Sequence, residues 1–186
     1  MTRALPAIHV EDFASDELGA VQVHDRVGDV IDLAHVPDRV QNVKYGHKLD
    51  FIAETRNWFA ARTGLSRAVL VGDLNIAPRE DDVWDHKALL KIVSHTPIEV
   101  ETLGKFQDAH GWVDLGRQHI PAPARYYSWW SYRNPAWQEN DKGRRLDHMW
   151  ASPEVARQAT GHRVLEAARA WEQPSDHVPL ITEFDL

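Results

Sequence analysis

The sequence predicts an α/β or α+β fold, in which helices and strands form the layers of one domain. Three segments support this prediction. Residues 44–62 have the apolar spacing of an amphipathic helix, with Ile52 and Phe59 near one face. Residues 68–71 are a short apolar run typical of a buried strand, and residues 178–184 alternate in the manner of a half-buried strand.

The chain before the first helix predicts little regular structure. We expect one short strand near Val27–Ala34 and irregular structure before it. Gly64 lies just past the last turn of the 44–62 helix and is expected to end it, since glycine is the usual helix C-cap residue.

The elements after the apolar strand follow in order. Residues 80–93 and 97–110 predict two helices, the second ended by Gly111. Residues 121–142 are rich in proline, aromatic residues and turn formers, and predict a long surface loop. Arg145–Ser152 predicts a further strand.

Length and composition fit one globular domain. The chain has 186 residues, of which 43% are hydrophobic. The absence of cysteine excludes disulfides and thiolate metal sites, and we expect a reducing, cytoplasmic location. The first residues lack a signal-peptide pattern. No apolar run approaches the ~20 residues of a membrane span, so we expect no membrane partner.

The acidity of the chain is concentrated near its start. Residues 1–40 carry three Arg and eight Asp or Glu, a balance of −5 within a total of −7, which leaves −2 for residues 41–186. The distribution of charge matters more than its total for nucleic-acid binding. A DNA-binding face is therefore compatible with the later part of the chain.

Three short motifs contain the residues that predict chemistry: Gly72–Asn75, Gly143–Asp147 and Ser175–His177. Together they supply three carboxylates, one amide and one imidazole. That set suits metal-assisted cleavage of a phosphodiester, in which negative charge is neutralised and water is activated. Zinc is not indicated, because the chain has neither Cys ligands nor a His-Glu-x-x-His pattern.

Asp73 and Asn75 lie two residues apart, directly after the predicted buried strand. Functional groups commonly lie at the carboxyl end of a strand in α/β folds. A carboxylate can orient or deprotonate a water, and an amide can donate a hydrogen bond to a phosphoryl oxygen. The alternative is an ordinary turn, since Gly, Asp and Asn dominate turns.

The other two motifs predict a carboxylate–imidazole pair. Asp147 lies inside an apolar strand, where it either orients His177 or faces solvent. A protonated His177 would stabilise the charge of a pentavalent phosphate. Asp176 either ligates or lies near a divalent cation, or belongs to a turn or helix cap.

Residues 126–133 are the densest aromatic cluster, and they include Trp129 and Tyr132. Aromatic rings beside Arg suit stacking on bases or on an exposed sugar, while core packing is the alternative for some of them. The flanking basic residues are the candidates for phosphate contacts. They are Arg125, Arg133, Lys142, Arg144 and Arg145.

Four segments resemble exodeoxyribonuclease III, the bacterial branch of the abasic-site endonucleases in the endonuclease/exonuclease/phosphatase superfamily. They are Gly72–Pro78, Tyr127–Arg133, Gly143–Asp147 and Ser175–Pro179. Lys44–Phe51 is also similar to the helix before the family's Gly-Asp strand.

The resemblance runs from about residue 42 to the end of the chain. It implies a four-layer α/β sandwich and a Mg²⁺- or Mn²⁺-dependent nuclease. Such an enzyme would cut duplex DNA at abasic sites and at 3′ ends. It also implies that Asp73 activates water, that Asn75 contacts the phosphate, and that Asp147 holds the ring of His177.

The same resemblance implies two further roles. Asp176 would lie near the metal, and Trp129 would line the pocket for the flipped-out abasic sugar.

The sequence also departs from the family. Family members carry an Asn-Gly segment and a Gln-Glu segment near the N-terminus, whose Glu is the principal metal ligand, and neither segment is found in residues 1–41. His35–Asp38 is the nearest counterpart of a Tyr-x-Pro-Asn segment, with His where the family has a catalytic Tyr. We therefore expect a divergent acidic segment over 1–41 and the C-terminal part of a nuclease domain over 42–186.

These departures have two consequences. An abbreviated sandwich, mostly the C-terminal half, predicts an exposed apolar sheet face that a homodimer or another partner would cover. Loss of the principal ligand predicts weak or absent metal binding.

The leading prediction is a DNA repair nuclease, and two alternatives stand beside it. One is a catalytically inactive fragment that binds DNA or a partner. The other is a phosphodiesterase of the same superfamily that acts on a small or lipid phosphate, although the aromatic cluster argues against it.

Overall fold

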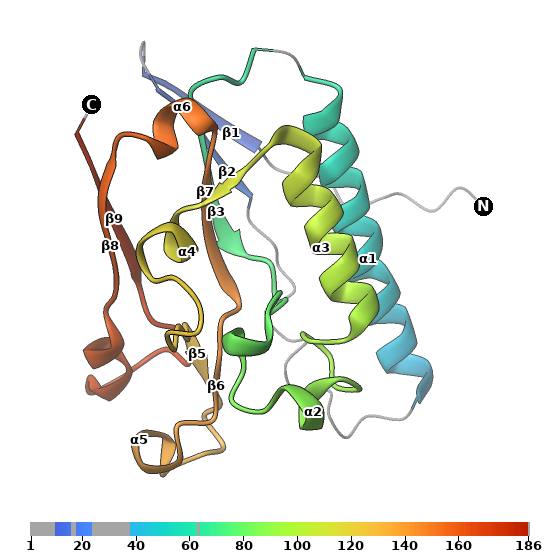
Figure 1. The fold of residues 1–186 in the computed structure, drawn as a ribbon. Helices are drawn as coiled ribbons and strands as arrows, with labels where there is room; N and C mark the ends of the chain where they lie inside the picture. Colours follow the sequence, from blue (N-terminus) through green and yellow to red (C-terminus); the bar gives the residue numbers. More distant parts are fainter. Residues whose placement is uncertain (1–9, 16–17, 24–37, 63, 186) are drawn as a thin grey trace.

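The computed structural model describes residues 10–15, 18–23, 38–62 and 64–185 (Figure 1). The strand predicted near Val27–Ala34 lies outside the described residues. In the part of the chain that is described, no helix is both long enough and apolar enough to cross a membrane.

A mixed sheet of five strands forms the centre of the molecule, in the order β1-β2-β3-β7-β4. These strands span Val10–Ser15, Leu18–Val23, Ala68–Asp73, Asp147–Ala151 and Val113–Asp114, in that same order. β2 and β3 are parallel, and the other neighbours are antiparallel. The strands β1 and β2 contradict the irregular structure predicted for this part of the chain.

Two long helices cover one side of this sheet (Figure 1). They are α1, Asp38–Ala60, and α3, Pro97–His110. Buried apolar side chains of both helices pack together with those of β3 and β7. The predicted helices over 44–62 and 97–110 and the strand over 68–71 are confirmed, and the boundary predicted at residue 41 falls within α1.

The ends of α3 follow from its sequence. Thr96 caps the helix by accepting from the Glu99 amide, Glu99 closes a capping box, and Pro97 occupies the first turn. Gly111 adopts the left-handed conformation, with φ of 66°, and ends the helix as predicted.

A hairpin covers part of the opposite side of the sheet (Figure 1). Its strands are β8, Ala159–Val164, and β9, Leu180–Phe184. Ala159 and Phe184 pack against buried residues that include Leu115 and Ala151. The structure describes the side chains of β3, β4 and β7 in this sheet. Among the residues whose side chains are described, the strongly exposed large apolar ones all lie outside the strands. The predicted exposed apolar sheet face is therefore not seen on these three strands.

The segment 80–93 is not one helix, which corrects the prediction. It contains a 3₁₀ turn, η2, at Glu80–Asp82 and a short helix, α2, at His86–Leu89, which is capped by the Asp85 side chain. Between them Val83 is extended and bridges to Arg144. The reason is the burial of Asp82, which turns toward two arginines instead of continuing a helix.

The predicted surface loop over 121–142 is wrong in its middle. Tyr126, Ser128, Trp129 and Trp130 are buried. β5, Trp129–Trp130, pairs with β6, Gly143–Arg144. The other short helices are α4, Leu115–His119, α5, Trp137–Asn140, α6, Pro153–Ala156, and the 3₁₀ helix η3, Glu166–Ala170.

Candidate active site

Antiparallel pairing of β3 with β7 sets Asp73 directly across from Asp147. The pairing continues one residue further, because the Leu74 amide donates to the Leu146 carbonyl at 3.1 Å. Two carboxylates that are 74 residues apart in the sequence therefore lie side by side at one end of the sheet.

The backbone turns sharply after Asp73. Asn75 has φ of 52°, in the left-handed region that Asn tolerates better than most residues. The backbone N–H of Asn75 donates to Asp73 Oδ1 at 2.8 Å, which is the hydrogen bond of an Asx turn. The predicted turn is therefore present, and Asn75 within it is only 5% exposed; the functional role of Asn75 stays a prediction.

His177 lies between the two carboxylates. Its Nδ1 donates to Asp147 Oδ2 at 2.9 Å, and its Nε2 lies 3.8 Å from Asp73 Oδ2. Because an ionised carboxylate only accepts, the bond to Asp147 requires the proton on Nδ1. Asp147 and His177, which the sequence predicted to pair, are thus hydrogen-bonded to each other.

Opposing influences act on the pKa of His177. Burial alone would lower it, but the hydrogen bond and charge of Asp147, together with the charges of Asp73 and Asp176, raise the pKa to about 9. The imidazole is therefore protonated near neutral pH. Three carboxylates around one imidazolium still leave an excess of negative charge, which suits a cation at this place.

Asp176 is fixed by the aromatic segment. Trp129 Nε1 donates to Asp176 Oδ2 at 2.9 Å, and the Trp130 amide donates to the Asp176 carbonyl at 3.0 Å. Trp129 also forms a backbone bridge with His177. Trp129 is 5% exposed, so it packs beside the site and orients one of its carboxylates.

Ser128 is a site residue that the sequence analysis missed. Its buried Oγ accepts from the amides of Leu146 and Asp147 at 3.0 Å each, and its carbonyl accepts from Val178 at 2.8 Å. It thereby joins the chain segments that carry Asp147 and His177. A small hydroxyl inside an aromatic run was the available signal.

The predicted substrate contacts fall into two groups. Tyr132 and Arg133 are exposed, and Tyr132 donates to the Pro174 carbonyl at 2.7 Å, one residue before the Ser175–His177 motif. Arg144 is partly buried; its Nη1 donates to Ser94 Oγ at 2.8 Å, and its guanidinium lies 5.3 Å from the centre of the Trp129 ring.

Arg145 belongs to a buried ion-pair network, which argues against the phosphate contact predicted for it. It has no exposed surface. Its Nε and Nη2 donate to the two oxygens of Asp82 at 2.9 Å each, and its Nη1 donates to Asp114 at 2.7 Å. Arg117 also pairs with Asp82. A phosphate could reach Arg145 only by displacing these partners.

The same network acts on His148, the neighbour of Asp147 in β7. His148 is fully buried and its Nε2 donates to the Ile76 carbonyl at 2.9 Å. Burial and the charge of Arg145 lower the pKa of His148 to about 4. This imidazole is therefore neutral at neutral pH.

A divalent cation fits the acidic end of the sheet. Asp73, Asp147 and His177 offer ligand atoms that all lie within 4.8 Å of one another. Two carboxylates are enough for Mg²⁺, which usually keeps several waters, and carboxylate oxygens suit Mn²⁺ as well. His177 would have to lose its proton before its ring could bind an ion. The predicted metal residue, Asp176, is not in this group, although its charge acts on His177.

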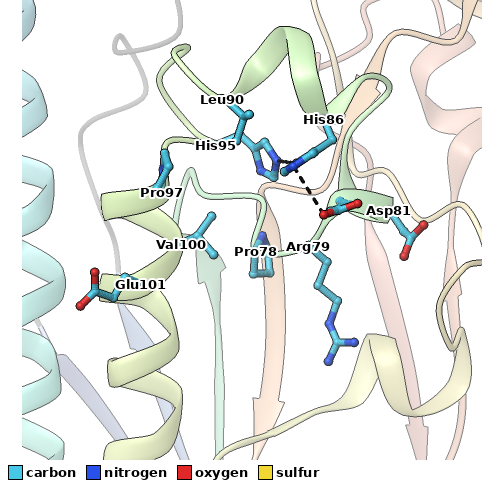
Figure 2. Close-up of a pocket in the computed structure, with 10 residues that line it drawn as sticks. Pro78, Arg79, Asp81, His86, Leu90, His95, Pro97, Val100 and Glu101 are labelled. Atoms are coloured by element: carbon cyan, nitrogen blue, oxygen red, sulfur yellow. Dashed lines mark hydrogen bonds and ion pairs between the residues drawn. The ribbon is translucent and has the colours of Figure 1, made fainter.

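A separate pocket lies between α3 and the segment that follows Pro78 (Figure 2). His86 lies between His95 and Glu80: its Nδ1 is 2.8 Å from His95 Nε2, and its Nε2 is 3.5 Å from Glu80 Oε1. The residues that line this pocket include none of the three motifs' acidic residues.

A model of the Endonuclease/Exonuclease/phosphatase family matches residues 21–177. The chain belongs to this family. The chain is also similar to exodeoxyribonuclease III of Haemophilus influenzae, with 29% identity over 153 residues, which cover 78% of this chain and 57% of that protein. It shares 33% identity over 112 residues with an exodeoxyribonuclease of Bacillus subtilis, covering 60% and 42% of the two chains.

Solved structures of the family have the same fold. An AP endonuclease from Archaeoglobus fulgidus aligns with a TM-score of 0.78 and 25% identity, over 91% of this chain and 62% of that one. The 3′-5′ exonuclease NExo from Neisseria meningitidis aligns with a TM-score of 0.76 and 26% identity, over 98% and 70%. The predicted family and fold class are confirmed, and the chain spans about half the length of the relatives it matches in sequence.

Proposed function

We propose that this chain is a DNA repair nuclease that hydrolyses phosphodiester bonds of duplex DNA at abasic sites and 3′ ends. The main support is the arrangement of His177 between Asp147 and Asp73. Relatives named exodeoxyribonuclease and AP endonuclease, and a neighbour described as a 3′ phosphatase bound to a product DNA hairpin, support the choice of DNA as the substrate.

In the proposed reaction His177 stabilises the negative charge that develops on the phosphate. Asp147 accepts from His177 Nδ1 and holds the ring, so that Nε2 faces the side of Asp73. Asp73 orients a water and accepts its proton. Asn75 donates from its side-chain amide to a phosphate oxygen.

A divalent metal, Mg²⁺ or Mn²⁺, is proposed beside these residues. Asp176 would hold it, as the resemblance to the family implies. When bound, such a metal would neutralise charge at the phosphate. The hydrogen bond from Trp129 Nε1 fixes Asp176 before any ion binds.

The proposed DNA contacts lie on the aromatic segment and the motif that follows it. Tyr132 and Arg133 are exposed beside the site and would contact the sugar and phosphates, as would Arg144. Trp129 would line the wall of the pocket for the abasic sugar. Arg145 is left out of this set because its donors are used in the core.

An incision assay tests the proposal directly. The purified chain is incubated with a duplex that carries one abasic site, with Mg²⁺, with Mn²⁺ or with EDTA. We expect incision that requires the metal and that Asp73→Ala abolishes. Asp108→Ala, on the exposed side of α3, is the matched carboxylate control and should cut like the wild type.

The second function, a catalytically inactive DNA-binding or partner-binding fragment, is favoured by the absence of the family's Gln-Glu segment. It predicts retained duplex binding without incision at any metal concentration. Division of the chain at residue 41, a cytoplasmic location and a homodimer also stay predictions. A sedimentation measurement that gives a monomer at micromolar concentration would contradict the homodimer.

A further inference from the structure

Three successive carbonyl groups in the loop after β3 each accept a hydrogen bond from a different buried basic side chain. Lys48 Nζ donates to the Asn75 carbonyl at 3.1 Å, His148 Nε2 to the Ile76 carbonyl at 2.9 Å, and His95 Nδ1 to the Ala77 carbonyl at 2.7 Å. All three side chains are at most 2% exposed. The loop that carries Asn75 is therefore fixed by its main chain.

Lys48 differs from the two imidazoles because it carries a full charge. It is buried, and it lies on the face of α1 that also carries Ile52. Its Nζ pairs with Glu99, which has no exposed surface. A buried ion pair is costly to desolvate and contributes little stability compared with apolar packing of the same volume.

Glu99 connects this pair to α3. Its Oε2 accepts from the Thr96 amide at 2.9 Å and from Thr96 Oγ1 at 2.8 Å, and both of its oxygens accept from the Ser94 amide at 3.0 Å. Lys48 thus ties the Asn75 carbonyl to the first turn of α3 through a single carboxylate.

The backbone conformation of Asn75 depends on the contacts that surround it. Its φ of 52° is uncommon for a residue other than glycine and persists only when surrounding contacts hold it. A shift of the Asn75 main chain out of this conformation would take its carbonyl away from Lys48 and would redirect the Cα–Cβ bond that carries the side-chain amide. Small displacements of a positioning group cost large factors in rate.

We propose that Lys48, with Glu99 as its counterion, is a positioning residue of the phosphodiesterase site that acts through the carbonyl of Asn75. The inference rests on the proposed function, in which the Asn75 amide contacts the scissile phosphate. Lys48 itself does not touch the substrate.

A double-mutant cycle tests this inference. Lys48→Met and Glu99→Gln are introduced together, because removing only one charge leaves the other buried and unpaired and endangers folding. Gln at position 99 still completes the capping box of α3. Asn75→Gly removes the amide side chain and keeps a residue that is at ease with positive φ.

We expect the paired substitution to lower kcat for abasic-site incision by about tenfold or more, with KM changed by less than about threefold. In the Asn75→Gly background the same substitution should lower the single-turnover rate by less than about twofold, because the group through which Lys48 acts is gone. Equal losses in both backgrounds would overturn the inference and indicate a structural role for the pair.

Ser152→Ala is the matched control for loss of a buried polar contact. Ser152 is 1% exposed, lies at the opposite end of β3 and donates to the Ser66 carbonyl at 2.6 Å. It should lower Tm and leave kcat unchanged. If the wild-type chain does not incise DNA, the proposed function fails; if it incises and the cycle is additive, only the role of Lys48 fails.

Discussion

Adjacent residues of β7 belong to two regions with opposite electrostatics. Asp147 points into the site, where three carboxylates surround the single imidazole of His177. His148 points into the core, where Arg145 and Arg117 balance Asp82 and Asp114. Strand pleating alone separates the two, since successive side chains face opposite sides.

The difference teaches how to tell a functional cluster from a structural one. The buried network is balanced by its own members, and each of its carboxylates has an arginine partner. The site is unbalanced, so its three carboxylates raise the pKa of His177 to about 9. An excess of one charge that the protein does not neutralise itself favours a ligand or a reaction at that place.

The largest expected effect is on catalysis, from His177→Ala. Loss of the imidazole should lower the incision rate by about 10²–10⁴-fold, because the charge on the phosphate is no longer stabilised. Tm should fall as well, because the pairing with Asp147 that raises the pKa of His177 also stabilises the fold at neutral pH, so rates are compared per folded molecule. Rates are measured with an abasic duplex, and the exposed His47→Ala serves as the control. An unchanged rate would show that the unbalanced cluster is not the site.

Next is the effect of Arg145→Met on stability. The substitution leaves Asp82 buried beside one remaining arginine and should lower the free energy of unfolding by about 3–5 kcal/mol. Turnover by the folded fraction should not change. Denaturant unfolding measures the change in stability, and active-site titration measures the turnover of the folded fraction.

Adding Asp82→Asn to Arg145→Met should recover part of the lost free energy of unfolding. If Arg145→Met instead weakens DNA binding and leaves stability unchanged, the phosphate contact predicted for Arg145 is correct.

A pH series distinguishes the two regions through His148. The pKa of this group is lower in the folded protein than its usual 6.5, so the unfolded chain takes up a proton first as the pH falls. The contribution of His148 to stability should be complete above pH 6.5 and decline toward pH 4, by a total on the order of 3 kcal/mol. His148→Gln, which keeps a donor for Ile76, should show a shallower decline, and equal slopes would contradict this account.

The smallest effect is expected at a surface ion pair. Arg67 Nη1 lies 2.9 Å from Glu154 Oε1, and both side chains are more than one third exposed. Glu154→Gln should cost less than about 1 kcal/mol in the free energy of unfolding, and added salt should remove most of that difference. A larger, salt-insensitive cost would mean that burial is not what separates strong pairs from weak ones here.

Local signals in the sequence were enough for part of the fold. The apolar run before Gly72 predicted β3, and the Thr96–Glu99 capping box with Gly111 matches the helix predicted over 97–110. The helix predicted over 80–93 failed because Asp82 is held by Arg145, 63 residues further along the chain. No local pattern indicates such a partner.

The candidate site was predictable where chemistry and motif coincide. The geometry unites Asp147 with His177 and brings Asp73 opposite Asp147. Arg145 was misread because a basic residue beside a motif has the same sequence signature whether it faces DNA or the core. Lys48 could have been found, since it lies four residues before the buried Ile52, on the same face of a helix.

Antiparallel pairing of β3 with β7 also has a kinetic consequence. The residues of the site come from segments up to 104 positions apart, from Asp73 to His177. Contacts so distant in sequence form late, because loop closure must precede them. During refolding, helical circular dichroism from α1 and α3 should recover before incision activity does, so that enzymatic activity reports the completion of the chain's longest-range contacts.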